Sequence, residues 1–95
     1  MWRKKTTEEK YARELFEIIQ KISSDKKLLK DFFIDLLTPH EYQEIIKRWQ
    51  IVKQLTKGIP QRKIAKNLKV GIATITRGSR ELSDKDGGFN KVLKG

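Results

Sequence analysis

The sequence predicts an all-α protein that contains a helix-turn-helix DNA-binding unit, and three observations lead to this prediction. Apolar residues recur every three or four positions, and no segment alternates with the period of two that strands require. The stretch QRKIAKNLKVGIATITRGSREL, residues 61–82, holds two short amphipathic segments joined by a tight connection. The net charge of +10 lies in the second half of the chain. A chain of 95 residues is expected to form a single domain, residues 1–95.

Residues 6–58 are expected to form three dimerisation helices. A capping box, Thr6-Thr7-Glu8-Glu9, precedes the first, and Ser23-Ser24-Asp25 ends it and caps the second. All three helices have wide apolar faces, and that of the first is wider than one partner helix needs. The apolar residues of the first are Tyr11, Leu15, Phe16, Ile18, Ile19 and Ile22, and those of the second are Leu28, Leu29, Phe32, Phe33, Leu36 and Leu37. We therefore infer a second subunit. A two-fold dimer would also present two recognition helices about 34 Å apart, one turn of DNA.

Strong start and stop signals frame the third helix. Thr38 is the predicted N-cap, Pro39 has no N–H to leave unpaired at the first position, and Glu41 completes a capping box. Gly58 is expected to end the helix. The residues expected to be buried along it are Tyr42, Ile45, Ile46, Trp49, Val52 and Leu55.

The helix-turn-helix is predicted over residues 61–82. Its buried contacts are expected at Ile64, Leu68, Val70 and Ile75, with small Ala65 where the two helices approach closely. The exposed side chains of the second segment can lie against base edges and phosphates, and they are Ala73, Thr76, Arg77 and Arg80. Residues 87–95 are expected to form a short C-terminal helix that packs against the dimer through Phe89, Val92 and Leu93.

The charge is distributed unevenly. Residues 1–46 contain nine Lys/Arg and nine Asp/Glu, whereas residues 47–95 contain thirteen Lys/Arg and three Asp/Glu, so the second half carries the whole excess of +10. A one-sided positive field attracts polyanions and speeds association with them. The charge also fits a basic RNA-binding protein, but the aromatic sheet surface typical of RNA modules is missing from the pattern.

Other classes of protein are excluded by what the sequence lacks. Without cysteine there is no disulfide framework or thiolate metal site, and no nucleophile–base pair or phosphate-binding glycine loop points to an enzyme. We expect no metal and no cofactor. No apolar run follows the basic start, and none approaches the length of a membrane span. We therefore expect a soluble cytoplasmic protein that has no membrane partner.

Gly78 lies inside the second helix of the helix-turn-helix, where a glycine costs about 1 kcal/mol relative to alanine. One explanation is a helix end or a tight helix–helix crossing. The other is a flat ligand against the backbone. Arg77 and Arg48 can sandwich an aromatic ring and hold a carboxylate, and Thr38 at a helix N-terminus can add a hydroxyl to the same anion.

Several motifs together resemble the bacterial tryptophan repressor family. They are LTP at 37–39, Arg48, IV at 51–52, QR at 61–62 and, most specifically, GIATITRGS at 71–79, and they span roughly residues 36–82. The resemblance implies an intertwined all-helical homodimer with L-tryptophan as corepressor. It also implies that the dimer acts as a transcriptional repressor on a palindromic double-stranded operator.

The resemblance implies a role for each matched residue. In the ligand site, Arg48 and Arg77 flank the indole, Arg77 and Thr38 hold the carboxylate, Gly78 gives the ring clearance and Val52 lines the pocket. Backbone carbonyls of Asp35 and Leu37 face the ammonium from the other subunit. On DNA, Arg62 beside Gln61 reaches a guanine, the side chains of Ile72, Ala73 and Thr76 face base edges, and Gly71 and Thr74 lie near phosphates; Arg80 is also placed on the DNA side.

The departures from the family pattern leave alternatives open. Glu81 stands where the family usually has a serine near the ligand ammonium. A carboxylate there can bind the ammonium more strongly, repel the ligand carboxylate, or pair with Arg77 and close the pocket. The alternatives to tryptophan are therefore a different aromatic amine or a constitutive, ligand-independent DNA-binding protein. Lys69 replaces the turn glycine, and Ala65 replaces a DNA-contacting lysine, for which Lys63 and Lys66 can substitute.

Overall fold

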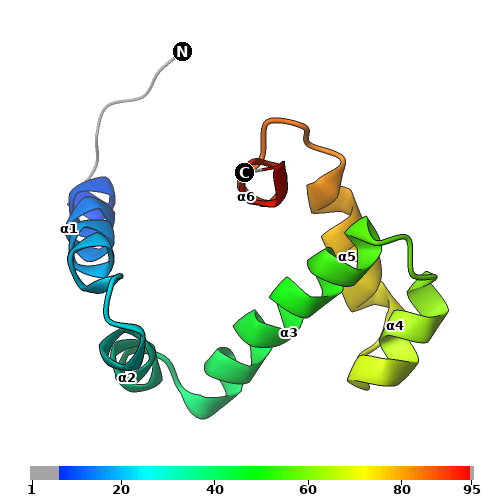
Figure 1. Cartoon of the computed structure of the whole chain (residues 1–95), viewed down its shortest axis with the longest axis horizontal. Helices are drawn as coiled ribbons and strands as arrows, with labels where there is room; N and C mark the ends of the chain where they lie inside the picture. Colours follow the sequence, from blue (N-terminus) through cyan, green and yellow to red (C-terminus); the bar gives the residue numbers. More distant parts are fainter. Residues whose placement is uncertain (1–6, 95) are drawn as a thin grey trace. The chain divides into compact units, whose positions relative to one another are not determined.

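Residues 7–94 are described by the computed structural model, and they form six helices and no strand (Figure 1). The prediction of an all-α protein is confirmed. The chain divides after Pro39 into two compact units, and each is described by itself. The single domain of residues 1–95 stays a prediction. Thr6, which begins the predicted capping box, and Gly95, the last residue of the predicted C-terminal helix, lie outside the described residues.

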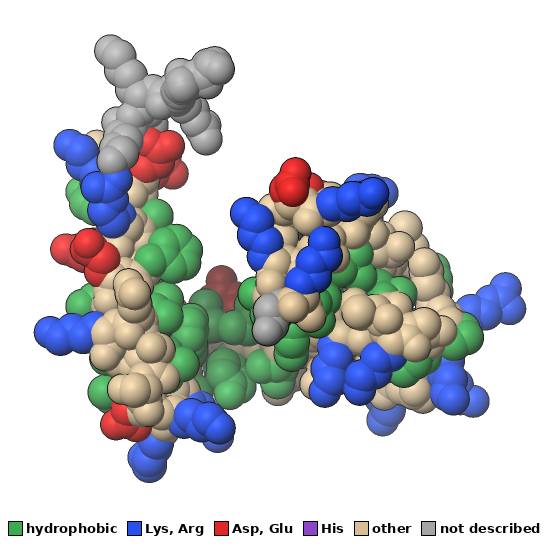
Figure 2. Space-filling model, turned by 45° about the horizontal axis from the view of Figure 1, so that its top comes forward, with side chains coloured by type: hydrophobic (Ala, Val, Ile, Leu, Met, Phe, Trp, Pro, Cys, Tyr) green, Lys and Arg blue, Asp and Glu red, His purple; other side chains and the backbone are tan. Residues whose placement is uncertain are grey.

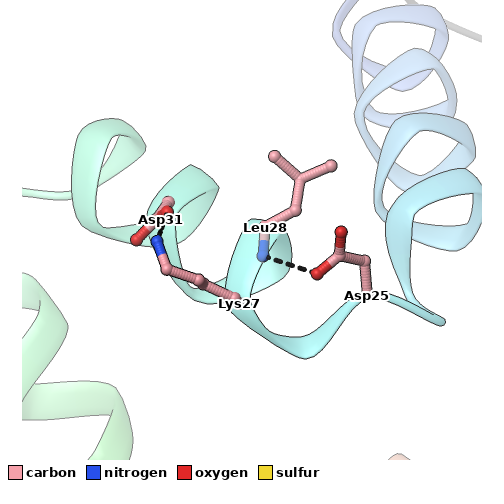
Figure 3. Close-up of polar contacts among 4 residues, drawn as sticks. All are labelled: Asp25, Lys27, Leu28 and Asp31. Atoms are coloured by element: carbon pink, nitrogen blue, oxygen red, sulfur yellow. Dashed lines mark hydrogen bonds and ion pairs between the residues drawn. The ribbon is translucent and has the colours of Figure 1, made fainter.

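The first unit contains α1 (Thr7–Ile22) and α2 (Lys26–Leu36). Asp25 is the N-cap of α2, since its carboxylate accepts a hydrogen bond of 3.1 Å from the N–H of Leu28 (Figure 3). The prediction of a break and cap at residues 23–25 is therefore confirmed. One turn further, Lys27 and Asp31 form an exposed ion pair of 3.2 Å, an i,i+4 contact that stabilises a helix by about 0.3–0.5 kcal/mol.

The apolar faces of α1 and α2 are not buried within the chain. Neither helix contains a buried residue, and Tyr11 and Phe16 are 68% and 64% exposed. Two short helices cannot enclose each other's apolar faces, so burial of these faces requires a further element. The wide faces thus remain available for the second subunit that the sequence predicts.

The second unit begins at His40, the second residue of α3 (Pro39–Thr56), and this helix starts at the predicted proline. Gly58, with φ +80°, follows its end. The N–H of Gly58 donates to the carbonyl of Leu55 at 2.9 Å, and that of Ile59 donates to Gln54 at 3.2 Å. This is the pattern of a Schellman motif, in which glycine takes the left-handed position without a Cβ clash.

The buried face of α3 differs from the predicted one. Ile51 and Val52 are each 1% exposed, whereas the side chains predicted to be buried at Ile45, Ile46 and Trp49 are 39%, 47% and 37% exposed. The helix carries apolar residues on two faces, and α4 and α5 cover the face of Ile51 and Val52. These three side chains are thus not buried within this chain, and their burial against a second subunit stays a prediction.

The helix-turn-helix consists of α4 (Gln61–Leu68) and α5 (Ile72–Leu82). Ile64 and Ile75 are fully buried and form a core with Ile51 of α3, against which Ala65, Leu68 and Val70 pack. The predicted buried contacts of residues 61–82 are therefore confirmed. This core holds the two helices of the unit against α3.

A short helix, α6 (Gly88–Lys94), completes the second unit and packs against α5. It is drawn in red in Figure 1. Phe89 and Leu93 are half-buried, and Val92 is 65% exposed. Phe89 lines a pocket of its own chain. The packing of this helix against the dimer stays a prediction.

Candidate ligand pocket and recognition surface

The second unit contains a pocket of about 460 Å³ between α3, α5 and α6. Ile51 and Val52 provide the apolar lining from α3, and Phe89 provides it from α6. A volume in this range suits a small organic ligand. Its remaining residues come from α3 and α5, and they are Glu44, Arg48, Ala73, Thr74, Arg77, Gly78 and Glu81.

The helical repeat of α5 explains why its five lining residues share one face. The lining residues recur at intervals of three or four positions, which places them one above another along a helix. They are residues 73 and 74, then 77 and 78, then 81. The same α5 is the second helix of the helix-turn-helix. The pocket therefore lies against the flank of the predicted recognition helix.

Two arginines predicted to hold a ligand lie together in this pocket, and the structure adds an acidic partner for one of them. The guanidinium of Arg48 lies 3.5 Å from the carboxylate of Glu44, one turn earlier on α3. Glu44 is also 3.7 Å from the imidazole of His40. The Arg48 and Glu44 side chains are about half exposed, so the pair is weak, on the order of 0.2–1 kcal/mol, and an arriving ligand can displace it.

The other arginine and its acidic neighbour are not paired. Within residues 7–94 no ion pair joins Arg77 to Glu81, although both line the pocket and are one turn apart on α5. The alternative in which Glu81 closes the site by pairing with Arg77 is thus not the arrangement in this structure. Besides the Arg48–Glu44 pair, α5 offers one cationic group and one anionic group to a ligand.

Gly78 occupies a tight crossing between α3 and α5. A Cβ built on it would lie 2.9 Å from Cγ2 of Ile51, closer than carbon atoms normally approach, and Ile51 is itself buried. The close-crossing explanation for this glycine therefore has a structural basis. Since Gly78 also lines the pocket, clearance for a ligand stays a second, compatible prediction.

Three predicted ligand residues do not belong to this unit. Asp35, Leu37 and Thr38 lie at the end of the first unit, with Asp35 and Thr38 exposed. None of the three lines the pocket of the second unit. Their expected contacts with a ligand, two of them from another subunit, stay predictions.

The predicted DNA-contacting residues lie on α4, on α5 and at the connection between them. All are exposed except Gln61, which is half-buried: the others are Arg62, Lys63, Lys66, Gly71, Ile72, Ala73, Thr74, Thr76 and Arg80. The side chain of Ile72, at the start of α5, is 49% exposed. An exposed apolar side chain at that end of a recognition helix suits contact with a thymine methyl group.

The connection between the helices has a specific backbone geometry. Lys69 has φ +56° and ψ +48°, and the N–H of Val70 donates to the carbonyl of Ala65 at 3.1 Å, as in a Schellman motif. The left-handed conformation expected at Lys69 is thus present, in a residue with a Cβ. It turns the chain so that α5 can begin at Ile72.

Basic side chains dominate the exposed face of the second unit. Among the charged side chains that Figure 2 shows on this unit, Lys and Arg predominate and Asp or Glu are few, whereas the first unit shows both signs. The charge asymmetry of the sequence is therefore present on this face. Such a surface attracts the phosphates of nucleic acid.

Sequence reasoning assigned Ala73 and Thr74 to DNA only, gave Ile51 no ligand role, and missed Glu44 and Phe89 of the pocket. Glu44 precedes Arg48 by four positions, a spacing that on a helix indicates an ion pair and that was available in the sequence. Phe89 had no comparable local signal, because its place depends on how the chain turns between α5 and α6.

Two absences can be stated for the described residues. None of the helices within residues 7–94 combines the length and apolar character needed to cross a membrane. In the same range no three His, Cys, Asp or Glu side chains gather where they could hold a metal ion.

Comparison with known proteins identifies a family. Residues 10–95 match the family model described as Trp repressor protein. A Trp operon repressor homolog of Vibrio vulnificus (strain YJ016) is 49% identical over 65 residues, which are 63% of this chain and 64% of that protein. The match thus spans less than two thirds of that relative's length.

Further relatives match over more of the chain. A Trp operon repressor homolog of Vibrio parahaemolyticus is 39% identical over 83 residues, which are 86% of this chain and 80% of that protein. A Trp operon repressor homolog of Haemophilus influenzae (strain PittEE) is 40% identical over 75 residues, which are 78% of this chain and 74% of that protein. No solved structure was found to match. Proteins of this family are DNA-binding regulators and not enzymes, as the sequence predicts for this chain.

Proposed function

We propose that this chain, which belongs to the Trp repressor family, is a sequence-specific transcriptional repressor that L-tryptophan activates as corepressor. It acts in the cytoplasm as a homodimer on a palindromic operator. One observation carries the proposal: the pocket is built on α5, the helix that also carries the predicted DNA contacts. A ligand there touches the recognition helix directly.

The pocket suits a zwitterion with an aromatic ring. We place the indole between the guanidinium groups of Arg48 and Arg77, over Val52 and Gly78. Arg77 also binds the carboxylate, with Thr38 as a further donor, and Glu81 binds the ammonium. An amino acid thereby satisfies both the unpaired cation and the unpaired anion of α5.

Ligand and DNA binding are coupled through the position of α5 relative to α3. A ring held between the two helices favours one orientation of the recognition helix. If that orientation matches the operator, ligand binding raises DNA affinity, and couplings of this kind are typically about 1–3 kcal/mol. Ala73 and Thr74 line the pocket, whereas Ile72, Thr76 and Arg80 of α5 do not and stay free to contact DNA.

The homodimer accounts for the apolar surface that a single chain leaves exposed. The faces of α1 and α2 and the Ile45, Ile46 and Trp49 side of α3 all need a partner. A two-fold axis also pairs two recognition helices with the two halves of a palindrome.

A second candidate ligand is an aromatic amine without a carboxylate. The observation that favours it is the second carboxylate in the pocket, Glu44, which already engages Arg48. Two carboxylates disfavour an anionic ligand group and favour a cation. The constitutive DNA-binding alternative requires instead that no ligand binds.

The test is calorimetric titration of L-tryptophan into the purified chain, with D-tryptophan, tyrosine and tryptamine in parallel. We expect saturable binding of one L-tryptophan per subunit and weaker binding of the others. Arg77→Ala should abolish the heat, whereas Arg62→Ala, an arginine outside the pocket, should leave it unchanged.

Each other result identifies an alternative. Preferential binding of tryptamine would replace tryptophan by an amine. No heat from any of the four would overturn ligand control and leave a constitutive DNA-binding protein.

A further inference from the structure

The connection between α5 and α6 is a compact turn organised by Asp84. Its carboxylate accepts a hydrogen bond of 3.0 Å from the N–H of Asp86, and its carbonyl accepts one of 3.0 Å from the N–H of Gly87. A Cβ on Gly87 would lie 3.2 Å from that carbonyl oxygen, so the turn leaves little room there. The turn brings α6 into contact with α5.

Asn90 fastens α6 to the end of α5. Its side-chain amide donates to the carbonyl of Leu82 at 2.9 Å and to the carbonyl of Asp84 at 2.7 Å. Carbonyls at the C-terminal end of a helix have no partner within the helix itself. The half-buried Asn90 supplies one to Leu82, the last residue of α5, and adds a second donor to the carbonyl of Asp84, which also accepts from Gly87. These two bonds and the turn together hold α6 at the end of α5.

Phe89 is the residue that this arrangement places at the pocket. It precedes Asn90 in α6, is half-buried, and lines the pocket opposite residues of α3 and α5. It also lines a second surface hollow, together with Trp49 and Val92. Phe89 therefore borders both hollows.

We propose that Phe89 determines the size of aromatic ring that the pocket accepts, and that Asn90 is a positioning residue that acts through it. The inference rests on the proposed function, because it concerns the same ligand. Two guanidinium groups can stack on the faces of a ring, but they leave its edge open. Phe89 closes that edge with an apolar surface and can make an edge-to-face contact.

The experiment compares wild type and Phe89→Ala in calorimetric titrations with L-tryptophan and with its 4-, 5-, 6- and 7-methyl derivatives. Phe89→Ala should bind L-tryptophan about 3- to 10-fold more weakly, which corresponds to the loss of one aromatic contact. It should also tolerate at least one methyl position that wild type rejects. Val92→Ala, an apolar truncation on the same helix outside the pocket, should change neither property.

Asn90→Asp tests the positioning role. The substitution keeps the shape of the side chain but replaces the two amide donors by an oxygen that the carbonyls repel. It should shift ring selectivity in the same direction as Phe89→Ala. The double variant should bind no more weakly than Phe89→Ala alone, because a residue that acts through Phe89 has no further effect once Phe89 is removed.

The outcomes separate this inference from the proposed function. If wild type binds L-tryptophan and Phe89→Ala keeps the wild-type affinity and methyl preference, the role of Phe89 is overturned while the proposed function stands. Additive losses in the double variant would overturn the role of Asn90. If wild type binds none of the ligands, the role of Phe89 and the proposed control by L-tryptophan are both overturned. Circular dichroism shows whether a variant is folded, and Phe89→Leu replaces Phe89→Ala if the latter is not.

Discussion

Lys69 is the only non-glycine residue within residues 7–94 with a positive φ. The left-handed backbone conformation costs a residue with a Cβ about 1 kcal/mol or more in conformational free energy, and glycine adopts it without this cost. Lys69→Gly should therefore raise the free energy of unfolding by about 1 kcal/mol, or the melting temperature by roughly 4–8 °C.

The control is Lys66→Gly, the same change inside α4, which should lower stability by about 1 kcal/mol. Thermal denaturation followed by circular dichroism measures both. Equal destabilisation by the two substitutions would show that the strain at Lys69 has no energetic consequence.

The two carboxylates of the pocket predict opposite effects. Glu44 competes with the ligand for Arg48, so Glu44→Gln should strengthen L-tryptophan binding by about 1.5- to 5-fold, the range expected for a half-exposed pair. Glu81→Gln removes the expected ammonium partner and should weaken binding about tenfold or more. Calorimetry measures both constants, and weakening by Glu44→Gln would mean that this carboxylate binds the ligand.

At the scale of elements, local signals predicted the helix ends well. Asp25, Pro39 and Gly58 act within a few residues of themselves, and each lies where the sequence indicated. Arg48, Arg77 and Gly78 could also be proposed from their chemistry, and they do line one pocket.

What sequence reasoning missed depends on contacts between distant segments. Ile51 is buried and Trp49 is exposed because of where α4 and α5 pack, and the periodicity of α3 carries no information about that choice. Phe89 reaches the pocket through the turn at Asp84, which a helical pattern does not describe.

The helix-turn-helix predicts that base contacts and ligand contacts can be separated. Arg62 is exposed at the start of α4 and does not line the pocket. Arg62→Ala should reduce discrimination between target and random DNA by about 1–3 kcal/mol, because a guanine contact is lost. L-tryptophan binding should stay as in wild type.

Fluorescence anisotropy with labelled target and random duplexes gives the discrimination. Lys66→Ala is the comparison, because a phosphate contact should weaken binding to both duplexes alike. If Arg62→Ala keeps the wild-type ratio of affinities, its assignment to a base is wrong.

At the scale of the whole molecule, the exposed apolar faces predict a stable homodimer. Light scattering should report twice the chain mass of 11.2 kDa. Phe16→Asp, on the exposed face of α1, should weaken the dimer more than 100-fold, because the two-fold axis repeats the loss of about 1.5–3 kcal/mol. Arg13→Asp, on the same helix, should leave a dimer. A wild-type monomer would contradict the prediction.

The central claim is that a ligand held between α3 and α5 controls the recognition helix. The most direct measurement is the affinity for a duplex, selected from random sequences in the presence of L-tryptophan, determined by anisotropy with and without the ligand at one fixed salt concentration. We expect L-tryptophan to raise the affinity about 5- to 150-fold, and the duplex to raise the affinity for L-tryptophan by the same factor. Equal DNA affinity with and without saturating L-tryptophan would contradict the claim.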